Sequence, residues 1–138
     1  MLDDLYREQI LDRYKHPRFR GPLDDPDARY EDENPLCGDR VVVYLKFDAD
    51  GKAQARFEGE GCAISMAAAD LLMEYATGQT ADALRGLTKD DVLDLIGLRL
   101  SPARLKCALL PYKALKAALY GLEADPGADA SATEGAAA

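Results

Sequence analysis

Apolar residues recur at helical spacing near the start of the chain and predict an amphipathic helix over residues 3–15. Pro17 is expected to end this helix, because proline cannot continue the backbone hydrogen bonds of a helix. The stretch 20–33 is rich in proline, glycine and acidic residues, which is typical of a loop, with a short edge strand near Ala28–Glu31. The apolar positions that define the helix are Leu2, Leu5, Tyr6, Ile10 and Tyr14.

Apolar and polar side chains then alternate over residues 41–47 and again over residues 53–58, which predicts two β-strands. The sequence Asp-Ala-Asp-Gly at 48–51 is a turn signal, so the two strands are expected to form a hairpin. Directly opposed residues must share a face of the sheet, which allows a register that pairs Phe47 with Ala53 and an alternative register shifted by two residues.

The register has a consequence for residues beyond the strands. With Phe47 opposite Ala53, the pairing continued past Val41 places Asp39 opposite Gly61. In either register, Cys37 and Cys62 are expected at the same end of the hairpin, although they lie far apart in the sequence.

A helical pattern over residues 63–76 follows the glycine-rich turn at 59–61, so Cys62 is expected at or just before a helix N-terminus. There the helix dipole and the free N–H groups favour a thiolate. Alanines dominate this helix, which we expect to be mostly buried. Its thin polar edge consists of Ser65, Asp70 and Glu74.

Thr80 and Thr88 are suitable N-caps for two short helices over 81–84 and 89–96. Ser101-Pro102 then has the composition of another helix start.

The last helix carries an apolar stripe, and both Lys106 and Cys107 lie off that stripe at about 100° per residue. Pro111 lacks the N–H that would bond to the Cys107 carbonyl. We therefore expect the helix to begin or bend near Cys107, which would leave this thiol near a helix end. The stripe consists of Leu105, Ala108, Leu109, Tyr112, Leu115 and Leu119.

The length and the charge of the chain limit the classes of function that it can have. The 138 residues suit one domain, residues 1–122, and the alanine-, aspartate- and glycine-rich stretch 123–138 predicts a disordered tail. A net charge of −8 argues against nonspecific binding to nucleic acid or anionic membranes. No apolar run has the length of a membrane span, and the N-terminus has no signal-peptide character. With three cysteines, we expect a cytoplasmic protein with reduced thiols.

The three cysteines and Asp39 together form a potential Cys₃Asp set of metal ligands. Thiolates suit zinc or iron, whereas the carboxylate is a harder and weaker partner, which favours a site that opens. Purely structural zinc sites more often use closely paired cysteines and histidines, although a structural zinc module remains an alternative. A Cys–His nucleophile is disfavoured, because the only histidine, His16, lies in a separate N-terminal turn.

These residues carry a resemblance to the IscU/SufU family of iron–sulfur cluster assembly proteins, which is related to the NifU N-terminal domain. The resemblance covers residues 1–122, and its motifs appear in the order of the family. The matching segments are Tyr14-x-x-Pro17-Arg18, Asn34-Pro35-x-Cys37-Gly38-Asp39, Gly59-x-Gly61-Cys62-Ala63-Ile64-Ser65 and Arg104-x-Lys106-Cys107-Ala108-x-Leu110.

The resemblance implies an α+β fold like that of SufE and NifU, with a small antiparallel sheet of about three strands covered on one face by helices. It also implies that Cys37, Asp39, Cys62 and Cys107 surround a metal or a nascent cluster. Sulfur would arrive as a persulfide from a cysteine desulfurase and pass to downstream assembly proteins. We expect Cys37 to accept it, because this thiol lies in a loop whereas the other two are tied to helices.

Two branches of the family remain possible. Scaffold-type IscU members have a histidine before the third cysteine, whereas Lys106 stands here as in SufU-type members, which resemble zinc-dependent sulfur acceptors. SufU-type members usually carry an insertion between the second and third cysteines, and this chain has no room for one. We give more weight to the ligand set and expect Zn²⁺ and sulfurtransferase-like activity. The alternative is a non-enzymatic scaffold that binds iron or a [2Fe–2S] cluster.

Overall fold

The structure is a computed structural model, and it describes residues 2–35 and 38–124. The first two residues of the predicted tail belong to the last helix, and residues 125–138 lie outside the described part of the chain. The elements are α1 Leu2–Lys15, β1 Ala28–Asn34, β2 Asp39–Phe47, β3 Ala53–Glu60, α2 Ala63–Ala76, α3 Ala81–Arg85, α4 Lys89–Ile96 and α5 Pro102–Ala124.

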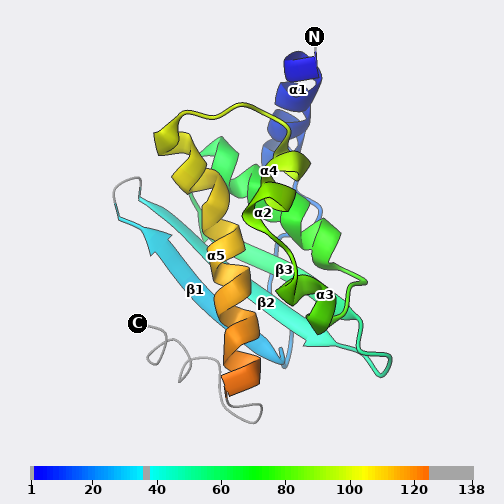
Figure 1. Ribbon diagram of the computed structural model, residues 1–138. Helices are drawn as coiled ribbons and strands as arrows, with labels where there is room; N and C mark the ends of the chain where they lie inside the picture. Colours follow the sequence, from blue (N-terminus) through cyan, green and yellow to red (C-terminus); the bar gives the residue numbers. More distant parts are fainter. Residues whose placement is uncertain (1, 36–37, 125–138) are drawn as a thin grey trace.

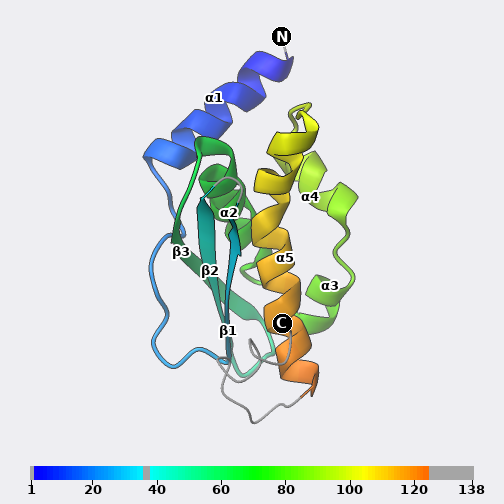
Figure 2. The same cartoon turned by 90° about the vertical axis from the view of Figure 1, so that its left-hand side faces the viewer.

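The three strands form one antiparallel sheet in the order β1-β2-β3, and helices cover one face of it (Figures 1 and 2). This confirms the α+β fold. The hairpin has the first of the two registers considered: Phe47 pairs with Ala53, and Val41 pairs with Gly59. The edge strand β1 runs three residues further than expected, to Asn34, which pairs with Asp39.

The core lies between the sheet and helices α2 and α5. Alternate residues of β2 and β3 point into it, and Val43, Leu45 and Phe57 have no exposed surface. Helix α2 contributes the most buried residues, as its alanine-rich sequence predicted. Small side chains allow a helix to approach a sheet closely, so α2 fits against β3 while α5 lies across β1 and β2.

The polar edge predicted for α2 is wrong for two of its three residues. Ser65 and Asp70 are fully buried, and only Glu74 is exposed. The Asp70 carboxylate accepts hydrogen bonds from the Arg13 guanidinium at 2.9 Å and from the backbone N–H groups of Arg18 and Phe19 at 2.8 and 2.7 Å. A buried carboxylate with three donors is satisfied, so Asp70 fixes α1 and the turn after it against α2.

The N-terminal half of α1 has a second contact. The Tyr6 ring lies over Gly97, where a Cβ atom would come within 2.4 Å of the ring. Gly97 also has a φ of +76°, a conformation that residues with side chains rarely adopt. The ring and the glycine thus join α1 to the segment between α4 and α5.

The expectations for α5 need two corrections. The helix starts at Pro102 as predicted, but it runs through Pro111 to Ala124, so Cys107 lies in its second turn and not at its beginning. Cys107 is also on the buried face, with 6% of its surface exposed, whereas Lys106 is exposed. The apolar residues of α5 are distributed around most of its circumference, so their spacing alone did not identify the face that packs on the sheet.

The structure confirms the N-caps predicted for the two short helices, α3 and α4. The Thr80 hydroxyl accepts from the N–H of Ala83, and the Thr88 hydroxyl accepts from the N–H of Asp91. The Asp91 carboxylate accepts from the N–H of Thr88 in return, and hydrogen bonds from Thr88 to this carboxylate lower its pKa. Within the described residues, no helix combines the length and apolarity needed to cross a lipid bilayer.

Candidate metal centre

Asp39 is the first residue of β2, and only 2% of its surface is exposed. Its Oδ1 accepts a hydrogen bond of 3.0 Å from the backbone N–H of Cys62, which follows β3. The hairpin register creates this contact, because it places Asp39 beside the last turn before α2. Gly61 lies so close that a Cβ atom there would be 2.6 Å from Asp39 Oδ1 and 2.5 Å from Ser65 Oγ.

Cys62 is the N-cap of α2, as the sequence predicted. Its Sγ accepts from the N–H of Ser65 at 3.4 Å, the bond that an N-cap serine or aspartate oxygen usually makes. The thiol also lies 3.8 Å from Asp39 Oδ2 and 3.6 Å from Ser65 Oγ. Cys62 as a residue is exposed, so the helix start that its sulfur caps lies at the surface.

Cys107 completes a compact group with these two residues. The ligand atoms of Asp39, Cys62 and Cys107 all lie within 4.8 Å of one another, although the residues come from a strand, a helix cap and another helix. They border a cavity of about 580 Å³ whose wall also includes Arg104. Arg104 therefore adds a positive charge to the wall of the cavity that the two thiols and the carboxylate border.

The donor set fits a thiophilic metal. Zinc–sulfur distances of about 2.3 Å and tetrahedral angles place two ligand atoms roughly 3.5–3.8 Å apart, and the Cys62 Sγ–Asp39 Oδ2 distance is 3.8 Å. Asp39 and Cys107 are the buried members of the group, and the second oxygen of Asp39 faces the Cys62 sulfur. Two cysteine sulfurs with one carboxylate suit zinc or iron better than calcium or magnesium, which prefer oxygen ligands.

The structure therefore brings together three of the four residues that the sequence singled out. The fourth, Cys37, lies outside the described residues, and the adjacent Gly38 has a φ of +73° with its N–H bonded to the Asn34 carbonyl at 2.9 Å. His16 is exposed after α1, and the described group of potential ligands contains no histidine. Sequence reasoning missed the part played by Ser65, whose buried hydroxyl lies against the Cys62 sulfur; its position three residues after a capping cysteine was the available signal.

Comparison with known proteins agrees with this geometry. The family described as NifU-like N terminal domain matches residues 5–128. The zinc-dependent sulfurtransferase SufU of Bacillus subtilis is 40% identical over 132 residues, which cover 83% of this chain and 89% of the relative. The iron–sulfur cluster assembly scaffold protein IscU of Thermotoga maritima is 34% identical over 131 residues, covering 83% of this chain and 92% of that protein.

Solved structures show the same architecture. The N-terminal part of a NifU-like protein from Brucella abortus superposes with a TM-score of 0.71 at 25% identity, covering 90% of this chain and 98% of that one. The SufU of Fervidobacterium islandicum gives a TM-score of 0.66 at 31% identity, covering 81% and 94% of the two chains.

Proposed function

The chain belongs to the NifU-like N-terminal domain family, and on this premise we propose that it is a zinc-binding sulfur acceptor in iron–sulfur cluster biogenesis. It takes persulfide sulfur from a cysteine desulfurase in the cytoplasm and passes it to downstream assembly proteins. The observation that carries this proposal is the convergence of Asp39, Cys62 and Cys107 on one accessible cavity. Lys106, which stands where scaffold-type members have histidine, favours the sulfur-acceptor role.

Four residues would hold the metal: Cys37, Asp39, Cys62 and Cys107. Bound zinc would stabilise the thiolate form of its cysteine ligands at neutral pH. Asp39 supplies the weakest of the four bonds, which suits a site that must open. Arg104 lines the same cavity and offsets part of the negative charge of the thiolates.

Cys37 is the sulfur acceptor in this proposal. Its thiolate attacks the terminal sulfur of the desulfurase persulfide, a new S–S bond forms on Cys37, and the desulfurase cysteine leaves as a thiolate. The other two thiols are less suited to reach into a second protein. Cys62 caps α2 through its sulfur, and Cys107 is buried in the second turn of α5.

Mass spectrometry tests this assignment after the protein reacts with the cysteine desulfurase of its own organism and cysteine. We expect one additional sulfur on the peptide that contains Cys37, and we expect Cys37→Ser to abolish stimulation of the desulfurase. Additional sulfur on Cys62 or Cys107, with Cys37 unmodified, would contradict the proposed transfer.

Zinc content tests the ligand set separately. The purified protein is expected to hold one zinc per chain, and Cys107→Ser should lower this content strongly because the sulfur of Cys107 lies within reach of both Asp39 and Cys62. Elemental analysis measures the difference, with the exposed neighbour Lys106→Ser as the matched control. Undiminished zinc in Cys107→Ser would remove Cys107 from the site.

A scaffold that assembles a [2Fe–2S] cluster on the same residues is the second candidate. It is favoured by the similarity to IscU proteins and by the separation of 45 positions between Cys62 and Cys107, which leaves no room for the insertion usual in SufU-type members. Iron and acid-labile sulfide in the freshly purified protein, in place of zinc, would support this role.

A further inference from the structure

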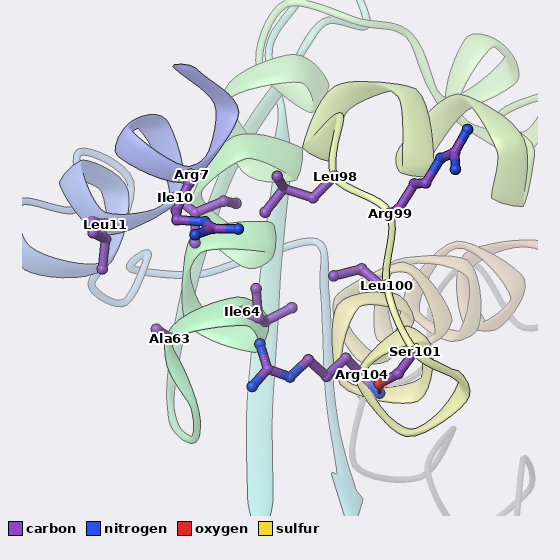
Figure 3. Close-up of a pocket in the computed structure, with 10 residues that line it drawn as sticks. All are labelled: Arg7, Ile10, Leu11, Ala63, Ile64, Leu98, Arg99, Leu100, Ser101 and Arg104. Atoms are coloured by element: carbon purple, nitrogen blue, oxygen red, sulfur yellow. Dashed lines mark hydrogen bonds between the residues drawn. The ribbon is translucent and has the colours of Figure 1, made fainter. Parts of the chain in front are cut away.

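A second cavity, of about 600 Å³, lies beside the metal centre. Its walls are one face of α1, the first turn of α2 and the segment that leads into α5 (Figure 3). It shares Ala63, Ile64 and Arg104 with the cavity of the metal centre, so the two are continuous along the surface. Much of its lining is apolar, including Ile10, Leu98 and Leu100.

Unpaired arginines gather at this cavity. Among the described residues, three arginine side chains have neither an ion pair nor a side-chain hydrogen bond, and all three, Arg7, Arg99 and Arg104, line it. In Figure 3 the side chains of Arg7 and Arg104 reach into the space around Ile64, whereas Arg99 points away from it. Arg7 does not line the cavity of the metal centre, so its position is not explained by a need to offset the negative charge of the thiolates.

Helix ends add to this positive potential. The first residues of α2, Ala63 and Ile64, and the residue before α5, Ser101, all border the cavity. Helix N-termini favour negative charge, and both helices are long enough for this effect, with 14 and 23 residues. In a chain with a net charge of −8, this is a surface where acidic groups are attracted.

Apolar surface continues beyond the cavity along α1. Arg7, Ile10, Leu11 and Tyr14 follow one another at helical spacing, so they share a face of the helix. Leu11 is 44% exposed and Tyr14 is 45% exposed. A small anion bound between the arginines would leave this stripe in water, whereas an extended segment of a protein could cover both.

We propose that this cavity docks an acidic, apolar segment of a protein partner. Carboxylates of the segment pair with Arg7 and Arg104, and its apolar side chains cover Leu11, Leu98 and Leu100. Charge complementarity selects the partner, and the shared wall brings it next to the metal centre. The proposal does not depend on the chemistry at the cysteines.

The test is a selection of 12-residue peptides from a random library on the full-length, metal-loaded protein. We expect the selected sequences to combine Asp or Glu with apolar residues. Arg7→Glu and Arg104→Glu should each weaken their binding by about tenfold or more, because each reversal sets two negative charges against each other. Arg99→Glu changes the net charge equally and should weaken binding less than about threefold, because its side chain points away.

Melting temperature and zinc content show whether each variant keeps its fold. Should Arg104→Glu disturb the metal centre, Arg7→Glu decides, because Arg7 lies outside that cavity. Selected peptides without acidic residues, or equal binding to wild type and Arg7→Glu, would overturn the proposal. So would a dimer in sedimentation experiments that Arg7→Glu abolishes, since a second copy would then occupy the cavity.

Discussion

Asp39 is both a potential metal ligand and a structural acceptor. One carboxylate oxygen holds the backbone N–H of Cys62, and the other faces the Cys62 sulfur. The same side chain therefore positions the helix cap whose sulfur it approaches. This arrangement explains why the carboxylate is buried at the end of a hairpin, where an aspartate would normally be solvated.

Replacement of Asp39 should separate these two roles. We expect Asp39→Ala to weaken zinc binding less than Cys62→Ser does, because a carboxylate is a weaker partner of zinc than a thiolate. The same variant should lose about 1–3 kcal/mol of stability, because the backbone N–H of Cys62 is left without its acceptor. Asp39→Asn keeps an acceptor oxygen and should recover most of the stability. Chelator competition and urea unfolding measure the two effects. Zinc loss in Asp39→Ala as complete as in Cys62→Ser would show that the carboxylate is not the weakest ligand.

At the scale of elements, α2 connects the metal centre to α1. Cys62 caps its first turn, and Asp70, two turns later, receives Arg13 and the backbone of the turn after α1. Helix α1 forms one wall of the second cavity, so the shape of that cavity depends on a carboxylate that does not line it.

Asp70→Asn tests this anchor. The amide oxygen can still accept from the backbone N–H groups of Arg18 and Phe19, but the NH2 group would then face the Arg13 guanidinium in place of the second carboxylate oxygen. We therefore expect a loss of about 2–4 kcal/mol in the free energy of unfolding. Glu74→Gln is the matched control, because Glu74 also pairs with Arg13 but its side chain is 48% exposed, and it should cost less than about 1 kcal/mol. Similar losses of unfolding free energy in the two variants would show that Asp70 does not hold α1 more strongly than Glu74 does.

The sequence predicted those elements whose residues obey a strict local rule. The hairpin register, within a shift of two residues, follows from the alternation of the pleat, and the caps of α3 and α4 follow from threonine chemistry. Helical periodicity did not identify the buried face of α5, because apolar residues lie on most sides of this helix, and so it did not show that Cys107 faces the core. The burial of Asp70 was not predicted either. A carboxylate is normally solvated, and the three donors of Asp70 come from residues more than fifty positions away. Clustering of Asp39 with Cys62 was predictable, whereas the placement of Cys107 required the packing of α5.

At the scale of the molecule, the metal centre and the second cavity adjoin at the first turns of α2 and α5, and α1 borders the second cavity alone. Helix α5 ends far from the metal centre, at Ala124, which is 17 residues beyond Cys107 and thus about 25 Å along the helix. The chain after Glu123 has almost no large apolar side chain, so ordering it would cost entropy with little burial in return.

Truncation after Glu123 should therefore leave the melting temperature and the zinc content nearly unchanged. Scanning calorimetry and elemental analysis of the shortened chain, beside the full chain, provide the measurement. A fall of several degrees would indicate that the removed residues dock on the domain.

The capping of α2 by a thiol has a spectroscopic consequence. Hydroxyl and carboxylate caps have one chemical form at neutral pH, but the sulfur of Cys62 can carry a proton, a metal or a second sulfur atom. The Ser65 N–H donates to that sulfur, so its electron density sets the strength of the bond. The amide resonance of Ser65 is thus a local reporter, in ¹⁵N spectra, of what the Cys62 sulfur carries.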